Sequence, residues 1–174
     1  MFKQQKGITL IALVITIIVL LILAGITIAM LTGSDSAPAK ANEAKQKQDI
    51  GSVKDQLYIL AQNAQLDFYN DTYVKDGAVS ASSVGGTASK KEVGIRVATA
   101  LTTGMADGKG IGDAKVHYST AATSNTDTTH NHAIEITIET RDYHVNGYVE
   151  LQGGALKWDS TISEGSQATA TSLK

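Results

Sequence analysis

The residue types that could carry chemistry are few and lie mainly in the second half of the chain. His130 and His132 are two positions apart, whereas His117 and His144 stand separately in the sequence. Two histidines on a loop do not define a metal site unless a third ligand follows at a known position. We therefore interpret them as exposed loop histidines, and we predict no metal ion and no cofactor.

Other catalytic patterns do not fit either. Glu135 and Glu139 fall on the polar side of an alternating segment, where we expect solvated carboxylates that are not paired as acid and base. The serines stand in no nucleophile-elbow sequence. The Gly-rich stretch 104–113 lacks the Lys-Ser/Thr pair of a phosphate-binding loop and the aspartate spacing of a calcium loop. The sequence therefore predicts no catalytic residue and a protein that is not an enzyme.

The dominant element is the stretch 8–31, ITLIALVITIIVLLILAGITIAML, which holds no charge and no proline. As a helix it would measure about 36 Å, and a hydrocarbon core is about 30 Å thick. We predict a transmembrane helix over residues 8–33. Lys3 and Lys6 precede the apolar stretch, so the N-terminus should stay inside and the bulk of the chain should lie outside.

The segment in front of this helix, MFKQQKG (residues 1–7), is short, polar and basic, and it ends in Gly7. An ordinary secretory signal has a shorter apolar core and is cut beyond that core. Here the natural break lies before it. This arrangement resembles the type IV pilin family with its type III leader: a short basic leader, a glycine, and a hydrophobic helix that the mature protein keeps.

The resemblance implies a processing site and a set of partners. A prepilin peptidase would cut between Gly7 and Ile8 and methylate the new amine of Ile8, and copies of the chain would leave the membrane to form a filament with the pilus assembly machinery. Gly25 would be a point where the helix extends locally in the packed filament. The alternatives for Gly25 are close packing of helices and simple tolerance of a glycine in lipid.

The chain departs from the family pattern at two positions. The family usually has Phe as the first mature residue and Glu as the fifth, where this chain has Ile8 and Ala12. That Glu pairs with the N-terminal amine of a neighbour in the family, so its absence argues against a standard major subunit. The chain also has no cysteine, so it cannot form the C-terminal disulfide of many Gram-negative pilins and looks more like the Gram-positive members.

Residues 34–70 predict an amphipathic helix, with Ser36 as its cap and Pro38 in its first turn. Its apolar positions recur every three or four residues: Ile50, Val53, Leu57, Leu60, Ala61, Ala64 and Phe68. In the family this half of the helix docks on the globular head. The aromatic residues Tyr58, Phe68, Tyr69 and Tyr73 are expected to pack in the core.

Residues 71–159 predict the head itself. A loop (71–89) precedes a helix from Ser89 to about Thr103, and four strands follow at 114–120, 133–140, 143–151 and 155–159. The fold class is therefore α+β, with the long N-terminal helix packed on a four-stranded antiparallel sheet as in a pilin. Residues 160–174 predict a polar tail without large core residues, apart from Ile162 and Leu173.

Composition narrows the function. The net charge is −2, and no basic cluster follows the apolar stretch, so we predict no nucleic-acid partner. We expect a structural subunit of a type IV pilus or related filament, in the cell membrane before assembly and on the surface afterwards. Three alternatives stay open: a minor pilin or pseudopilin of a secretion or DNA-uptake machine, an uncleaved single-pass binding protein, and a secreted domain cut near Ala39 or Ala41.

Overall fold

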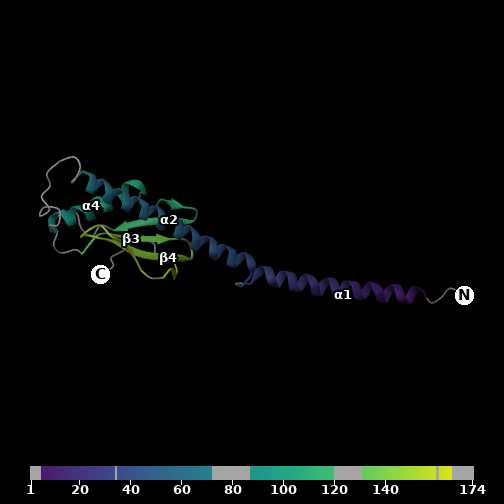
Figure 1. Cartoon of the computed structure of the whole chain (residues 1–174). Coiled ribbons are helices and arrows are strands. Elements are labelled where there is room, and N and C mark those ends of the chain that lie inside the picture. The colour runs from purple at the N-terminus through teal and green to yellow at the C-terminus, as the bar shows by residue number, and fades with distance from the viewer. Residues whose placement is uncertain (1–4, 34, 72–86, 120–130, 160, 166–174) are drawn as a thin grey trace. The chain divides into compact units, whose positions relative to one another are not determined.

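The structure, a computed structural model, describes residues 5–33, 35–71, 87–119, 131–159 and 161–165, with side chains over the same ranges except at 5–9 and 87–89 (Figure 1). The chain divides into two units, Met1–Ala44 and Lys45–Lys174. The first unit contains helix α1 and the start of helix α2. The second, which we call the head, contains the rest of α2, helix α4 and the sheet.

Helix α1 spans Gln5–Thr32 and consists almost wholly of apolar residues. The chain turns at Gly33, whose carbonyl oxygen accepts a hydrogen bond from the amide of Ser36 at 2.9 Å. The Ser36 hydroxyl then accepts the amide of Ala39 at 3.4 Å, which satisfies one of the free donors at the start of α2. The predicted cap therefore stands where α2 begins.

Helix α2 spans Ala37–Asn70 and has one buried stripe. Its side chains buried against the head are Gln46, Ile50, Val53, Leu57, Ala61, Ala64 and Phe68, and Leu60 packs partly buried beside them. This spacing of three and four residues places them on one face of the helix. The amphipathic pattern predicted from the sequence is confirmed here.

Helix α4 spans Thr87–Gly104. It begins two residues before Ser89, which the sequence predicted as its cap. Val93, Val97 and Leu101 turn into the core. A Cβ added to Gly94 would lie 2.2 Å from the carbonyl oxygen of Leu151. The glycine is therefore required for the close packing of this helix on the chain beyond β4.

The sheet has six strands among the described residues, all paired antiparallel. They are β1 (Gly110–Ile111), β2 (Ala114–Ser119), β3 (His132–Glu139), β4 (Tyr143–Glu150), β5 (Leu156–Trp158) and β6 (Ser163–Glu164). Strands β1 to β5 follow in chain order, and β6 also pairs with β4. The α+β class is confirmed, but the prediction of four strands misses β1 and β6.

The two missed strands have only two residues each, so they carry no readable alternation. β1 lies in the Gly-rich stretch, where Gly112 (φ 59°) and Asp113 form a two-residue hairpin loop to β2. β6 lies in the segment that was predicted as a polar tail. The remaining residues of that tail, 166–174, lie outside the described residues, as does most of the predicted 71–89 loop.

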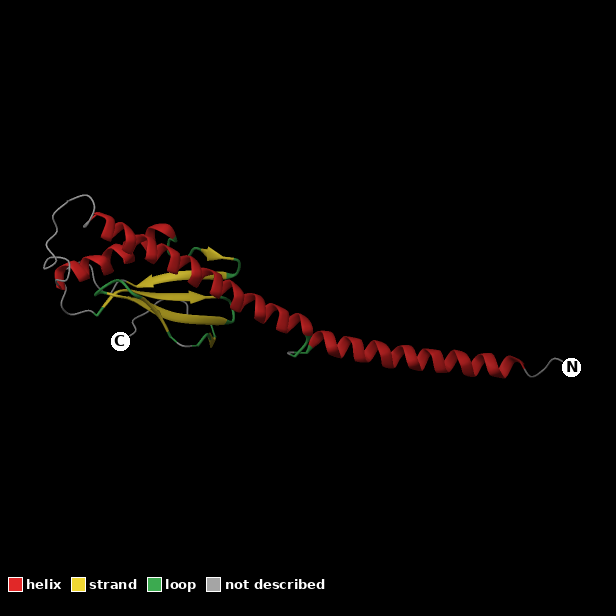
Figure 2. Cartoon of the chain, viewed as in Figure 1, coloured by secondary structure: helices red, strands yellow, loops and turns green. Residues whose placement is uncertain are grey.

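The core lies between the helices and one face of the sheet, and Figure 2 shows α2 and α4 together on that side. The sheet contributes buried side chains that alternate along the strands, including Val116, Ile134, Ile136, Ile138, Val145 and Val149. β4 continues through Gly147, which pairs with Trp158 of β5. The competing hairpin turn at Asn146-Gly147 is therefore absent, as the consistent apolar face of the strand predicted.

Polar contacts fasten α2 to two turns of the sheet. The buried Gln46 donates to the Asp142 carboxylate at 2.8 Å and accepts the Asp142 amide at 3.1 Å, at the turn between β3 and β4. Asp49 accepts the amide of Asp113 at 2.9 Å, at the turn between β1 and β2. Because these turns meet complementary groups on α2, the helix register on the sheet is specified beyond its apolar stripe.

Candidate functional site

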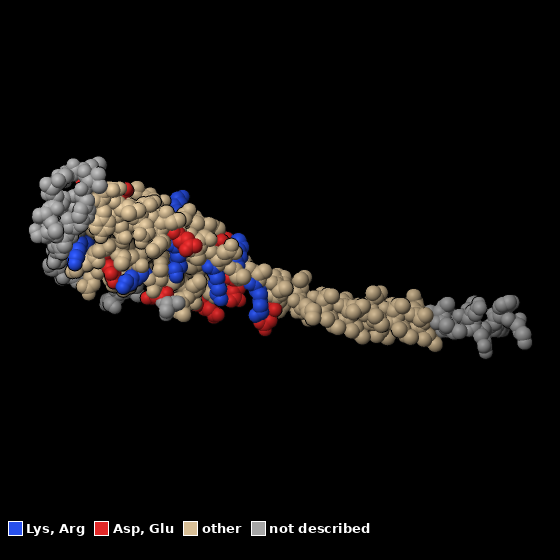
Figure 3. All heavy atoms as spheres, in the orientation of Figure 1, with Lys and Arg blue, Asp and Glu red and all other residues tan. Residues whose placement is uncertain are grey.

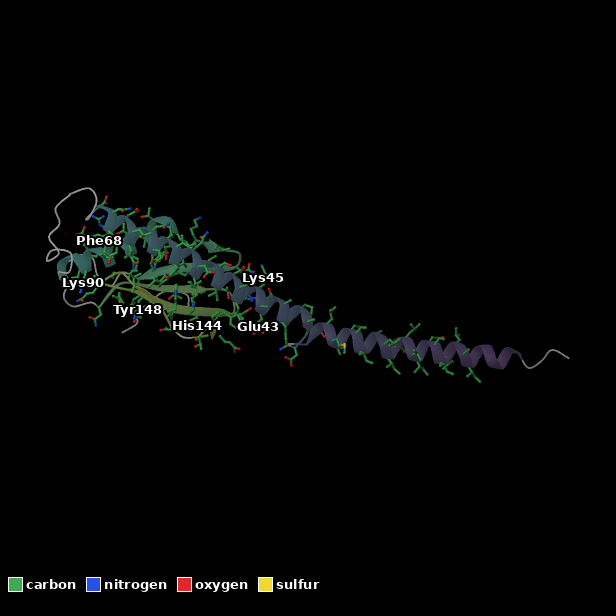
Figure 4. The ribbon with its side chains drawn as sticks, viewed as in Figure 1. Glu43, Lys45, Phe68, Lys90, His144 and Tyr148 are labelled. Carbon is green, nitrogen blue, oxygen red and sulfur yellow. The ribbon has the colours of Figure 1, made fainter. Side chains whose placement is uncertain are left out.

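The candidate site on the first unit is the surface of α1, which is apolar on every side. Its sixteen large hydrophobic side chains, from Leu10 to Leu31, are between 45% and 73% exposed. From Leu10 onward, where the side chains of this helix are described, Figure 3 shows no acidic or basic side chain along it, and Figure 4 shows side chains projecting to both sides of it. Burying one such side chain contributes about 1.5–3 kcal/mol. Leaving all of them in water would therefore cost tens of kcal/mol relative to an apolar environment.

The polar side chains of α1 that are described form hydrogen bonds within the helix. The hydroxyls of Thr16, Thr27 and Thr32 each donate to a carbonyl oxygen three or four residues earlier, at 2.8–2.9 Å. Backbone and hydroxyl donors thus need no water, which an apolar medium requires. By length and composition, this is the one segment among the described residues that could cross a membrane.

The predicted processing residues Gly7 and Ile8 both lie within α1, which begins at Gln5. Gly25 lies further along the same helix, and a Cβ added there would meet nothing within 4 Å. The packing of the chain itself therefore gives no reason for a glycine at this position. Ala12, where the family carries Glu, is exposed on the same apolar surface.

The head carries a polar sheet face, opposite the helices, that holds His117, His132 and His144. His117 lies between two carboxylates, with Nδ1 3.4 Å from Asp107 and Nε2 3.4 Å from Glu139. His132 stacks on Tyr148 with ring centroids 3.9 Å apart, and its Nδ1 lies 3.7 Å from Glu135. Figure 4 labels Tyr148 and His144 on β4.

The expectation of solvated carboxylates is wrong on this face. Glu135 is only 8% exposed, and the Glu139 side chain is 15% exposed, because neighbouring side chains of the sheet cover them. Alternation showed which side of β3 they occupy, but it could not show how closely the adjacent strands pack. His132 lies beside Glu135 and His117 beside Glu139. The sequence did not predict these two pairs.

These groups do not assemble into a metal centre in the part of the chain that is described, where no group of three or more His, Asp or Glu side chains is placed so that it could hold a metal ion. His130 lies outside it. His144 contacts the carbonyl oxygen of Gly165 through Nδ1. Burial, and to a lesser extent Asp107, raises the pKa of Tyr118, whose hydroxyl donates to the Leu101 carbonyl at 3.3 Å. Tyr118 is thus a packing residue, held neutral.

The aromatic residues near the end of α2 separate into two groups. Phe68 is buried and lies under the guanidinium of Arg96, whereas Tyr58 and Tyr69 are exposed. The prediction that all of them pack in the core is therefore wrong for these two tyrosines, and Tyr73 lies outside the described residues. The helical period places Tyr58 and Tyr69 away from the buried stripe. The prediction gave more weight to their aromatic character than to this period.

Comparison with protein families, with curated proteins and with solved structures gives no significant match.

Proposed function

We propose that this chain is a structural subunit of a type IV pilus or a related surface filament. It is processed after Gly7 and assembled through the apolar helix α1. The observation that carries the proposal is the exposed, uncharged surface of α1 directly behind a short basic segment that ends in glycine. A helix of this kind needs either lipid or copies of itself around it.

The physical logic is an exchange of surroundings. In the membrane, α1 contacts lipid tails, which are as apolar as its own side chains. In a filament, α1 would contact the same helix of neighbouring copies, so its surface stays out of water in both states. The chain can then move from one state to the other without exposing its large side chains.

The absence of a carboxylate at Ala12 has a consequence for assembly. Within a bilayer an ionisable side chain is costly unless it is paired, and this chain offers no such group between Ile8 and Leu31. Neighbouring copies would then associate by packing alone. This favours a minor or initiating subunit, or a pseudopilin of a secretion or DNA-uptake machine, as the variant to distinguish from a major pilin.

The described residues of the head offer no catalytic arrangement for the proposal to use. Its histidines and glutamates form pairs on the outer sheet face and not an acid–base constellation. We propose a role in assembly or surface contact and no enzymatic activity. The partners are copies of the chain, a prepilin peptidase, the assembly machinery and, before assembly, the membrane.

The decisive test is the intact mass and N-terminal residue of the protein sheared from the cell surface. A chain that starts at Ile8, with or without one added methyl group, supports processing as a pilin. A chain that starts at Met1 and stays in the membrane supports a single-pass anchored binding protein instead. A start near Lys40 or Asn42 makes it a secreted domain, and the filament proposal is then wrong.

A substitution at the junction sharpens this test. Gly7→Val places a β-branched side chain at the position that the peptidase must accept, so we expect cleavage and surface filaments to be lost. Gln4→Val is the matched control, because it places the same β-branched side chain in the leader but away from the junction. Immunoblots of membrane and sheared fractions measure both. Wild-type filament levels in Gly7→Val would refute cleavage at this site.

A further inference from the structure

The outer face of α2, opposite its buried stripe, carries large apolar side chains that the head does not cover. Tyr58, Ile59, Leu66 and Tyr69 are 55%, 57%, 60% and 46% exposed. With about 100° of rotation per residue, they fall within an arc of about 100°. Beyond α1, they are all of the exposed large hydrophobic side chains in the part of the chain that the structure describes. They therefore form a cluster on one face, whereas single exposed hydrophobic residues are normally scattered over a protein surface.

The same face carries a glycine that the head does not require. Gly51 precedes Tyr69 by five helical turns, so the two residues point in the same direction about 27 Å apart. A Cβ added to Gly51 meets nothing within 4 Å. A glycine inside a helix costs about 1 kcal/mol relative to alanine. Close approach of another chain at Gly51 would explain why a glycine is present there.

The composition of the face matches that of a protein interface. Between Gln48 and Tyr69, its other members are Gln48 and Gln62, and Asp55 is the one charged residue on that part of the face. Nearer the start of α2, Lys40 points in the same direction as Tyr58. Interface centres are poor in charge and rich in aromatic residues, and tyrosine is a frequent energetic anchor. One end of the face carries the bulky Leu66 and Tyr69, and the other end carries Gly51. The two ends are complementary in shape.

We propose that the outer face of α2 binds the same face of a second copy, shifted along the helix by five turns. Tyr69 of one copy would then lie over Gly51 of the next, and Leu66 over Gln48. Such a contact uses two different ends of one surface, so it does not close on itself and adds copies without limit. The parallel direction of the copies rests on the proposed function, in which all the apolar helices point the same way.

Cysteine cross-linking tests this contact, because the native chain has no cysteine. We would express the full-length double variant Gly51→Cys/Tyr69→Cys in cells that assemble the filament, oxidise it mildly, and separate the products without reducing agent. A disulfide forms only when two Cα atoms lie within about 7 Å. We expect a ladder of dimers, trimers and longer products, and at least a tenfold lower yield of cross-links from either single variant.

The matched control is Lys45→Cys/Gln63→Cys, which has the same 18-residue separation on another exposed face of α2. A control ladder as strong as that of the test pair would overturn the proposal, because it would show random collision. Dimers without longer products would also overturn it, because they indicate a closed, twofold contact. If the first pair fails to fold by circular dichroism, Gln48→Cys/Leu66→Cys probes the same contact.

The outcome separates this inference from the proposed function. Sheared filaments whose chains start at Ile8 but do not cross-link would overturn the contact and leave the pilin role standing. A ladder from chains that start at Met1 would support the contact and contradict processing. If neither Gly51→Cys/Tyr69→Cys nor Gln48→Cys/Leu66→Cys forms cross-links, the self-association proposal is wrong.

Discussion

Helices α1 and α2 are both long, but they relate to their surroundings in opposite ways. From Leu10 to Leu31, α1 is apolar on every side and leaves its large side chains exposed, whereas α2 is amphipathic and buries one stripe in the core. A helix that is hydrophobic all round needs an apolar environment outside its own chain, and an amphipathic helix finds its partner within it. The difference separates the helix whose apolar side chains are buried within the fold from the helix whose apolar side chains need an apolar environment outside it.

The polar groups of the two helices follow the same division. The threonine hydroxyls of α1 donate to the helix itself, so they engage nothing beyond it. On α2, Gln46 and Asp49 reach the turns of the sheet. Polar side chains on α2 therefore specify how the head is built, while those on α1 only make the helix compatible with an apolar medium.

The largest expected effect comes from truncating one leucine in each helix. Leu57 is fully buried in the head, so Leu57→Ala should lower the free energy of unfolding of the head by about 2–5 kcal/mol. Leu20 is 64% exposed, so Leu20→Ala should leave head unfolding unchanged. Thermal unfolding of the full chain in detergent, followed by the near-UV signal of Trp158, measures both. Equal destabilisation by the two variants would contradict the comparison.

A smaller effect should separate the two helix glycines that differ most in surroundings. Gly94→Ala forces a methyl group to within 2.2 Å of the Leu151 carbonyl oxygen, and overpacking of this kind costs about 1–3 kcal/mol. Gly25→Ala meets open space, so head unfolding should not change. The same thermal measurement applies. A Gly94→Ala head as stable as the native one would show that α4 can shift without loss.

The smallest effect should appear on acidification of the contact between Asp142 and α2. Hydrogen bonds from Arg141 and then from Gln46 hold the pKa of the Asp142 carboxyl below its ordinary value of 3.8. A lowered folded-state pKa adds stability above the unfolded value, and this stability is lost as the pH falls through the folded-state pKa. The head should therefore lose stability below about pH 4, and Asp142→Asn should flatten that part of the profile. An unchanged acid profile in the variant would exclude this carboxyl as a contributor.

Much of the fold could be predicted because its signals are local. The uncharged run of α1, the three-and-four spacing of Ile50, Val53 and Leu57, and the alternation of Ile134, Ile136 and Ile138 each report a period that one element needs. The cap at Ser36 is equally local. Strands β1 and β6 could not be found in this way, since two residues carry no period and their pairing depends on a neighbouring strand.

The candidate sites divide by the same rule. The junction at Gly7 and Ile8 is a pattern in the chain alone and remains a prediction that only processing can test. The burial of Glu135, the two carboxylates around His117 and the exposure of Tyr58 all depend on residues distant in sequence. Local pattern placed each of them on a face of its element, but it did not say what lies across from that face.

The sequence by itself determined that one helix would be apolar throughout, that a second would be amphipathic, and that an antiparallel sheet would follow, because period and composition are properties of contiguous residues. Only the tertiary structure decided which polar groups of α2 hold the sheet turns and where Gly94 lets two backbones meet. It also decided which apolar side chains of α2 the head leaves uncovered. Those outcomes depend on distances between elements, which the free energy of packing sets and no single segment encodes.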